Sequence, residues 1–128
     1  MEVLITNGIK ITVRPEYEAI HSEPDQGKFI FSYEVLIENL SEHTVQLLRR
    51  HWYIFDSAVG YKEITGEGVV GQQPILLAGA SHIYHSWCPL TSDLGRMYGF
   101  YEFKKIGEET VFPVRIPEFE LIAPFRLN

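Results

Sequence analysis

The stretch Lys28-Phe29-Ile30-Phe31-Ser32-Tyr33-Glu34-Val35-Leu36-Ile37-Glu38 decides the fold class of this chain. Every second residue from Phe29 to Ile37 is large and apolar, so one unbroken hydrophobic face recurs at the two-residue period of a β-strand. The opposite face mixes charged and polar residues with Ile30 and Leu36. This pattern predicts a strand in the middle of a sheet, with something partly covering its second face.

The same alternation recurs on both sides of this stretch. Further strands are predicted over residues 9–14, 44–55, 61–65, 81–89, 96–106 and 112–116, and the first six residues form either a short strand or a loose terminus. Turn-forming clusters of Gly, Pro, Asn, Asp and Ser separate these segments, and no window favours a helix of useful length. The chain is therefore predicted to be all-β, a sandwich or barrel of roughly seven to nine strands.

Three positions in the C-terminal half carry more specific predictions. Gly99 lies inside a strand, which indicates a bulge or close packing. Pro113 and Pro117 share the parity opposite to the inward-facing residues, so both are expected on the unpaired side of an edge strand. The core is expected to close near the C-terminus with Phe119, Leu121 and Phe125.

Length and composition indicate one folded unit. The chain has 128 residues, of which 45% are hydrophobic, including eight Phe, seven Tyr and two Trp. A domain of this size buries roughly two-thirds of the surface of its unfolded chain, which suffices for a core of its own. We therefore expect a single domain over residues 1–128.

Charge and cysteine content limit the partners and the compartment. The net charge of −6 disfavours non-specific binding to nucleic acid or to anionic membranes. Cys88 is the one cysteine, so an internal disulfide is not available and a reducing compartment is expected. The sequence begins without a signal-peptide pattern and has no apolar run near ~18 residues. These features predict a cytoplasmic protein.

The stretch Thr65-Gly66-Glu67-Gly68-Val69-Val70-Gly71-Gln72-Gln73-Pro74 contains G-x-G-x-x-G. In dinucleotide-binding folds this motif precedes a helix, whose N-terminus holds the pyrophosphate. Here another predicted strand follows Pro74, so the helix is missing. A structural loop is the favoured interpretation, in which glycines supply positive φ or allow close packing. The alternative is a backbone nest for an anion or nucleotide at Gly66, Gly68 and Gly71, which Glu67 opposes.

Catalytic and metal-binding patterns are weak. The five histidines form no H-x-H pair, and no C-x-x-C occurs. The carboxylates come closest to clustering at Glu108-Glu109, which is more simply a solvated loop. No G-x-S-x-G marks a nucleophile, and the favoured interpretation of Cys88 is a small residue packed in the core. The sequence predicts no enzyme activity, no metal site and no cofactor.

A binding role has better support. Arg49-Arg50-His51-Trp52-Tyr53 brings positive charge and aromatic rings together on one predicted strand. Arg, Trp and Tyr are the residues that most often anchor protein interfaces. The alternative is that Trp52 lies in the core and that Arg49 and Arg50 are solvated.

Taken together, these segments resemble the ApaG family. The resemblance covers nearly the whole chain, and the glycine stretch is specific because its flanks match as well. It rests on residues 45–52, 66–74, 77–79, 84–86, 94–101 and 116–119.

The resemblance implies a fibronectin type III-like, immunoglobulin-like β-sandwich of antiparallel strands. It also implies a small stand-alone domain, associated with cobalt and magnesium tolerance or efflux and with protein–protein interaction. In the family the glycine stretch has been regarded as a possible pyrophosphate motif, with Gly66, Gly68 and Gly71 as the matching positions here. We therefore expect a non-enzymatic module with an unidentified protein partner or a homodimer. A nucleotide or pyrophosphate binder is the alternative.

Overall fold

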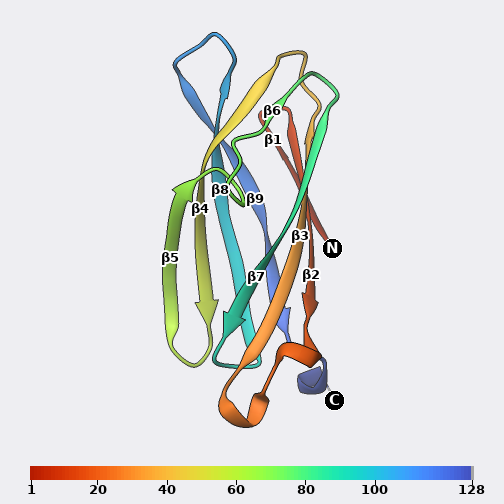
Figure 1. The fold of residues 1–128 in the computed structure, drawn as a ribbon, viewed down its shortest axis with the longest axis vertical. Coiled ribbons are helices and arrows are strands. Elements are labelled where there is room, and N and C mark those ends of the chain that lie inside the picture. The colour runs from red at the N-terminus through yellow and green to blue at the C-terminus, as the bar shows by residue number, and fades with distance from the viewer. Residues whose placement is uncertain (128) are drawn as a thin grey trace.

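The predicted alternation of residues 28–38 is realised as the central strand of a two-sheet structure (Figure 1). The computed structural model describes residues 1–127. Short 3₁₀ turns occupy Ala19–His21, Pro24–Gln26 and Pro124–Leu127. The strands of the described chain are β1 (Glu2–Thr6), β2 (Ile9–Tyr17), β3 (Phe29–Asn39), β4 (Val45–Asp56), β5 (Gly60–Glu67), β6 (Ile75–Leu76), β7 (Ser81–Leu90), β8 (Leu94–Lys105) and β9 (Val111–Ile122).

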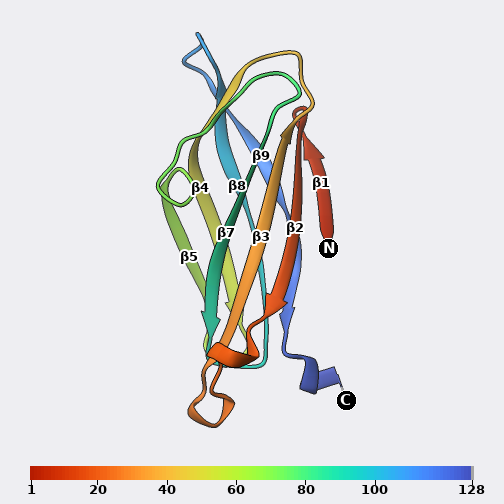
Figure 2. The same ribbon diagram turned by 45° about the vertical axis from the view of Figure 1, so that its right-hand side comes forward.

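The strands form two antiparallel sheets. One has the order β1-β2-β3-β7, and the other has the order β5-β4-β8-β9, with β6 pairing onto β4. Figure 2 shows β7, β3, β2 and β1 across the front and the second sheet behind them. The all-β sandwich is thereby confirmed, with antiparallel pairing between neighbouring strands. Its finer likeness to fibronectin type III domains stays a prediction.

The core lies between the sheets because the apolar residues, which alternate with polar ones along each strand, point inward. On β3 the buried residues are Phe31, Tyr33, Val35 and Ile37. Trp52 of β4 is only 2% exposed and meets the Tyr33 ring edge-on at 5.4 Å. Burying ~150–250 Å² of ring at ~25 cal/mol per Å² contributes roughly 4–6 kcal/mol. Trp52 is therefore a core residue, which decides between the two interpretations of its role.

Two β-bulges change which parity faces inward. Leu48 is the extra residue of β4 where it pairs with β8. On β9 the register shifts opposite Gly99, so two residues oppose Tyr98. The predicted bulge is therefore found beside Gly99, with its extra residue on β9 rather than at the glycine itself. Close packing is present as well, because a side chain at Gly99 would overlap the His51 carbonyl of β4.

The second bulge corrects the prediction for Pro117. β9 is an edge strand, as expected, but the bulge moves the inward parity from Val114 and Ile116 to Phe119 and Leu121. The Pro117 side chain is then buried, whereas the Pro113 side chain is exposed. The placement of both prolines on the unpaired side of the strand stays a prediction. A bulge shifts the side-chain period by one residue, so parity cannot be extrapolated across it.

Phe125 also differs from its prediction. It is 48% exposed and follows the last strand in a 3₁₀ turn, so it does not close the core. Its ring lies 6.0 Å from Tyr17 and 6.3 Å from Phe29, at the rim between the sheets. Phe119 and Leu121 are buried as predicted, and Ala123 is the third buried residue near this end of the chain.

Candidate functional site

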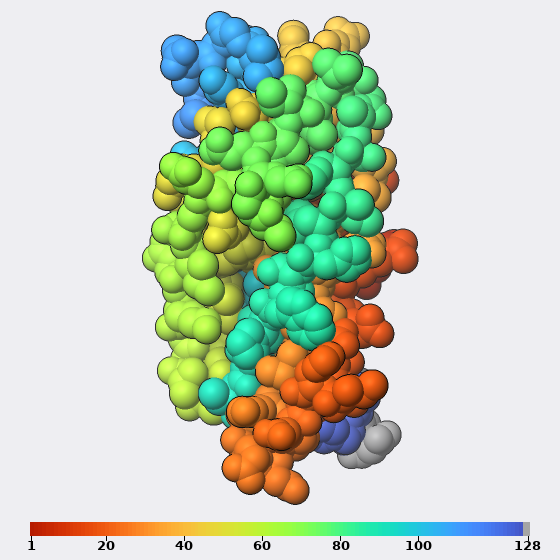
Figure 3. Space-filling model, in the orientation of Figure 1, coloured from red at the N-terminus to blue at the C-terminus, as the bar shows by residue number. Residues whose placement is uncertain are grey.

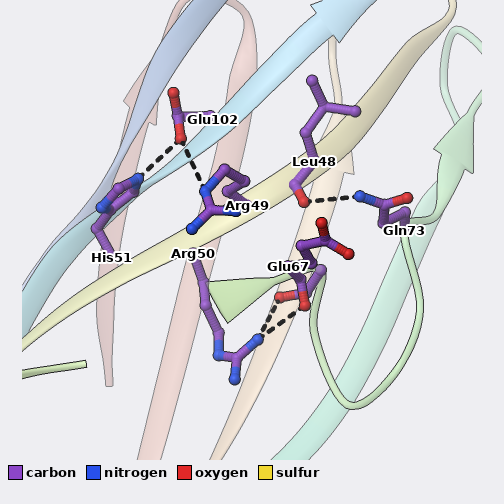
Figure 4. A network of polar contacts seen from close by, with 8 residues as sticks. Leu48, Arg49, Arg50, His51, Glu67, Gln73 and Glu102 are labelled. Carbon is purple, nitrogen blue, oxygen red and sulfur yellow. Dashed lines mark hydrogen bonds and ion pairs between the residues drawn. The ribbon is translucent and has the colours of Figure 1, made fainter. Parts of the chain in front are cut away.

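The glycine stretch is fastened to β4 at the Leu48 bulge. The Leu48 carbonyl accepts the Gly68 N–H at 2.8 Å. It also accepts the Gln73 side-chain amide at 2.9 Å (Figure 4). The N–H of Leu47 donates to the Pro74 carbonyl at 3.1 Å. A bulge frees a backbone carbonyl from regular pairing, and here that carbonyl holds the loop. The connection between β5 and β6 is therefore tied to one strand near both of its ends.

The tip of the stretch is a tight two-residue turn. Val69 and Gln72 exchange backbone hydrogen bonds at 2.8 and 3.0 Å. The two residues between them have positive φ, 47° at Val70 and 75° at Gly71. This is the geometry of a type I′ hairpin, which glycine adopts freely and a β-branched residue adopts only with strain. Val70 is nevertheless exposed at this tip.

The three motif glycines have different surroundings. Gly66 pairs with Arg50 across β4 and β5, and a Cβ there would lie 2.8 Å from both terminal nitrogens of its guanidinium. A Cβ at Gly68 would overlap the Gln72 carbonyl, whereas Gly71 has open space around it. The N–H groups of Gly68, Val69 and Gln72 are all used within the fold. The anion site at these glycines stays a prediction.

Arg50 lies beneath this loop. Its Nη1 donates to the Glu67 and Gly68 carbonyls at 2.9 and 3.0 Å (Figure 4). Arg50 is partly buried, and within residues 1–127 it forms no ion pair with a carboxylate. The loop thus presents carbonyl oxygens to the arginine, which fix the orientation of its guanidinium while its charge remains uncompensated.

Arg50 lines a cleft between the edges of the two sheets. β5 and β7 are end strands of their sheets and lie on the same side of the sandwich (Figures 1 and 3). The cleft is lined by residues of β3, β4 and β7 and by the loop that follows β5. Its volume is about 420 Å³. Tyr33, Trp52 and Tyr84 form the floor, and the Val69–Val70 turn closes one end. We call this the edge cleft.

The hydroxyl groups at the floor of the edge cleft are neutral hydrogen-bonding groups. The hydroxyl groups of Tyr84 and Tyr101 are hydrogen-bonded to each other, with their oxygens 2.5 Å apart. Burial raises the pKa of Tyr33, Tyr84 and Tyr101 above the ordinary tyrosine value, and the nearby Arg50 charge only partly offsets it. At neutral pH these phenols keep their protons, so the floor of the cleft and the residues directly beneath it carry no charge.

A second surface is the outer side of the β5-β4-β8-β9 sheet. Facing rings pair across its strands: His51 with Phe100 at 4.3 Å, Tyr53 with Tyr98 at 5.3 Å, and Phe55 with Tyr61 at 4.9 Å. Tyr61 is 63% exposed and the other five are partly exposed. We call this set the aromatic face; it comprises His51, Tyr53, Phe55, Tyr61, Tyr98 and Phe100.

Charged groups border the aromatic face. The Glu102 carboxylate lies 2.8 Å from His51 Nε2 and 3.6 Å from Arg49 Nε (Figure 4). The Arg96 guanidinium lies 4.9 Å from the centre of the Phe55 ring. A hollow of about 500 Å³ adjoins Tyr53, Tyr98 and Phe100. The face thus combines flat rings, a neighbouring depression and charges of both signs.

The basic-aromatic segment predicted for binding is divided between these surfaces. Arg50 and Trp52 point inward to the edge cleft, while Arg49, His51 and Tyr53 point outward. The Leu48 bulge, which holds the loop, was missed. A signal for it exists in the sequence, because the apolar parity changes between Leu47 and Trp52.

Two other features concern the part of the chain that the structure describes. Residues 1–127 contain no group of three His, Cys, Asp or Glu side chains arranged to hold a metal ion. Nor do they contain a helix of the length and apolarity that crossing a bilayer requires.

The order of strands, the two bulges and the tied glycine turn define a small antiparallel β-sandwich with one edge cleft and one aromatic sheet face. The family model described as the ApaG domain matches residues 19–105. Because this is more than half of the chain, the chain belongs to the ApaG family.

Relatives support the same assignment. The chain is 45% identical to Protein ApaG of Brucella suis biovar 1 (strain 1330) over 121 residues, which cover 94% of this chain and 92% of that protein. It is 43% identical to Protein ApaG of Rhodospirillum centenum over 120 residues, with the same coverage of both. A crystal structure described as an ApaA protein from Bordetella pertussis superposes with a TM-score of 0.86 at 39% identity, covering 91% of this chain and 94% of that one.

Proposed function

We propose that this protein is a non-enzymatic module that binds a partner protein through the aromatic face. The observation that carries the proposal is the row of three aromatic pairs on the outer side of a sheet. Aromatic residues and arginine are enriched where protein interfaces are buried and dominate their binding energy. A depression of about 500 Å³ beside Tyr53 and Tyr98 offers room for an anchoring side chain.

A purely structural role does not explain why these rings are accessible. Cross-strand aromatic pairs stabilise a sheet by about 0.2–1 kcal/mol each, and they need no exposure to do so. Here the rings remain accessible, although the opposite side of the same strands is already packed by Trp52, Ile54, Met97 and Tyr101. Contiguous exposed apolar surface of this kind is typical of an interaction site.

The test compares capture of partners by immobilised variants. The double substitution Tyr53→Ser/Phe100→Ser removes two rings of the aromatic face, and Ile83→Ser on the outer side of β7 is the matched control. We expect a discrete partner with the wild-type chain and with the control, and its loss with the double variant. Circular dichroism and thermal unfolding verify that all three chains are folded. Equal capture by the folded double variant would contradict the proposal.

The second candidate function is the binding of a nucleotide or pyrophosphate at Gly66, Gly68 and Gly71. The observation in its favour is the strained backbone of Val70, because residues forced to positive φ often mark ligand sites. Titration with inorganic pyrophosphate, followed by backbone amide shifts, tests it. Shifts at Val70 and Gly71 at millimolar concentration support this function, and their absence removes it.

Two further aspects belong to the proposal. The cobalt and magnesium tolerance associated with the family is proposed to act indirectly, through the partner, rather than through a resident metal. The cytoplasm is the proposed compartment. Cys88 is supporting evidence, because it is a buried free thiol whose pKa burial raises to about 11, so it is unreactive and needs no oxidising environment.

A further inference from the structure

The edge cleft contains an arginine without a counter-ion. Arg50 donates to two backbone carbonyls from one nitrogen, Nη1, and has no carboxylate partner within residues 1–127. The protein as a whole carries a net charge of −6. A partly buried cation that stays unpaired on an acidic protein is poorly compensated, so an anionic group that enters the cleft gains a charge-assisted hydrogen bond there.

Other charges around the cleft do not cancel Arg50. Lys62 is exposed on β5 opposite Ile54 and does not line the cleft, and the charges of Lys62 and Asp56 act with opposite signs on the pKa of Cys88. Glu34 lies on β3 beside the rim, but His85 pairs with it at 3.0 Å. Glu67 carries an exposed carboxylate beside Gly68, but the residues that line the cleft itself include Arg50 and no carboxylate. The charge inside the cleft is therefore positive.

Most of the remaining lining is apolar or aromatic, and His85 and Ser86 are its polar members. Trp87 is 53% exposed at the rim and is in contact with the His21 ring, with centroids 5.3 Å apart. Val70 is 64% exposed and lines the same cleft, held there by a turn that a β-branched residue adopts only with strain. An apolar side chain of a ligand can lie against both residues while an anionic group reaches Arg50.

The edge of β7 supplies the third element of recognition. β7 pairs with β3 on one side and is the end strand of its sheet on the other. An open strand edge offers backbone N–H and C=O groups that can pair with an added extended segment. Ser86 and Trp87 of this strand line the cleft, so an added segment would lie across from Arg50.

We propose that the edge cleft binds an extended peptide segment of a partner protein that carries a carboxylate next to a bulky apolar residue. The segment adds to the edge of β7, its carboxylate pairs with Arg50, and its apolar side chain lies between Val70 and Trp87. A planar guanidinium fork matches a carboxylate. A polyphosphate needs several donors, and the loop uses the N–H groups of Gly68, Val69 and Gln72 internally.

This site is separate from the aromatic face, because Arg50 and His51 are neighbours on β4 that point to opposite sides of the sheet. The two binding roles can therefore be tested independently. A result that removes the peptide site leaves the aromatic face untouched, and the reverse also holds.

The test uses backbone amide and indole N–H shifts of the full chain. The probes are capped hexapeptides of Val and Thr that contain one Glu next to one Phe, and matched peptides with Gln in place of Glu. We expect the Glu peptides to shift amides of β7 and the Trp87 indole at millimolar concentration. The Gln peptides should bind about tenfold more weakly or worse, since a charge-assisted hydrogen bond is lost.

Variants test whether Arg50 causes the difference in affinity between the Glu and Gln peptides. Arg50→Gln should abolish the difference between Glu and Gln peptides, and Arg49→Gln, one residue away on the opposite side of β4, should leave it unchanged. Trp87→Ala, at an exposed position that leaves the core intact, should weaken binding of both peptides. Inorganic pyrophosphate serves as the competing probe.

Four results would overturn the proposal. They are equal affinity for Glu and Gln peptides, shifts confined to the aromatic face, no shifts at all at millimolar peptide, and shifts of the loop amides by pyrophosphate when no peptide binds.

Discussion

At the scale of single residues, the glycine stretch is explained by what each glycine leaves room for. Gly66 makes space for the Arg50 guanidinium, and Gly68 allows the turn at Gln72 to close. The sequence predicted that these glycines shape a loop. It could not show that Gly66 faces Arg50, because that contact joins residues 16 positions apart across a ladder whose register a bulge sets.

The first prediction compares two alanine substitutions in that stretch. Gly68→Ala places a Cβ against backbone at a φ of +61°, so it should cost about 2–5 kcal/mol of unfolding free energy. Gly66→Ala meets only the end of the flexible Arg50 side chain, so it should cost about 1 kcal/mol or less while displacing the guanidinium. Urea unfolding and the Arg50 Nε–H resonance report the two effects. Equal losses of unfolding free energy in the two variants would contradict this prediction, because they would show that the Arg50 side chain yields no more easily than backbone.

At the scale of elements, buried polar residues fix how turns meet strands. Asp56 ends β4 and is 6% exposed. Its carboxylate accepts hydrogen bonds from the N–H groups of Ala58 and Thr91 and from the hydroxyls of Thr91 and Ser92, at 2.7–3.1 Å. These bonds tie the turn after β4 to the turn between β7 and β8.

Asp56 should therefore make stability depend on pH. Burial alone would raise the pKa of its carboxyl, but the hydrogen bonds from Ser92, Thr91 and Ala58 outweigh burial and lower the pKa. The stabilisation is complete above the unfolded-state pKa of about 3.9 and is lost as the pH falls through the lower folded-state pKa.

The substitution Asp56→Asn should remove about 2–3 kcal/mol of unfolding free energy at pH 7. It should also flatten the acid limb of the stability curve. Asp25→Asn in the exposed 3₁₀ turn is the control and should leave both unchanged. Urea unfolding at neutral and acidic pH measures the effect. An acid limb as steep in the Asp56 variant as in the wild type would contradict the role given to this carboxylate.

The strands themselves followed from the sequence, and the exceptions have a common cause. Period-two alternation in segments such as residues 28–38 is a local property, so the strands and the all-β class could be predicted. Pro117 was misplaced because a bulge on β9 shifts parity, and bulges arise from pairing with another strand. Phe125 was misplaced because an apolar residue past the last strand need not reach the core.

At the scale of the whole molecule, the two candidate sites lie on different sides of one sheet. The aromatic face is built from residues that alternate with core residues along β4 and β8, so a sequence pattern could indicate it. The edge cleft depends on which strands end each sheet, a property of topology that spacing along the chain does not encode. Under the two proposals, a broad aromatic surface and a narrow charged cleft of one small sandwich contact different parts of a partner.

The central claim, that a partner protein docks on the aromatic face, is tested most directly by site-specific photo-crosslinking in the cell. The photo-reactive amino acid p-benzoylphenylalanine replaces Tyr98 on the aromatic face or Asp25 in the exposed 3₁₀ turn Pro24–Gln26, which belongs to neither proposed site. We predict a discrete crosslinked product with a different protein from position 98 and none from position 25. A product from position 25 alone, or a product at position 98 that contains only a second copy of this chain, would contradict the claim.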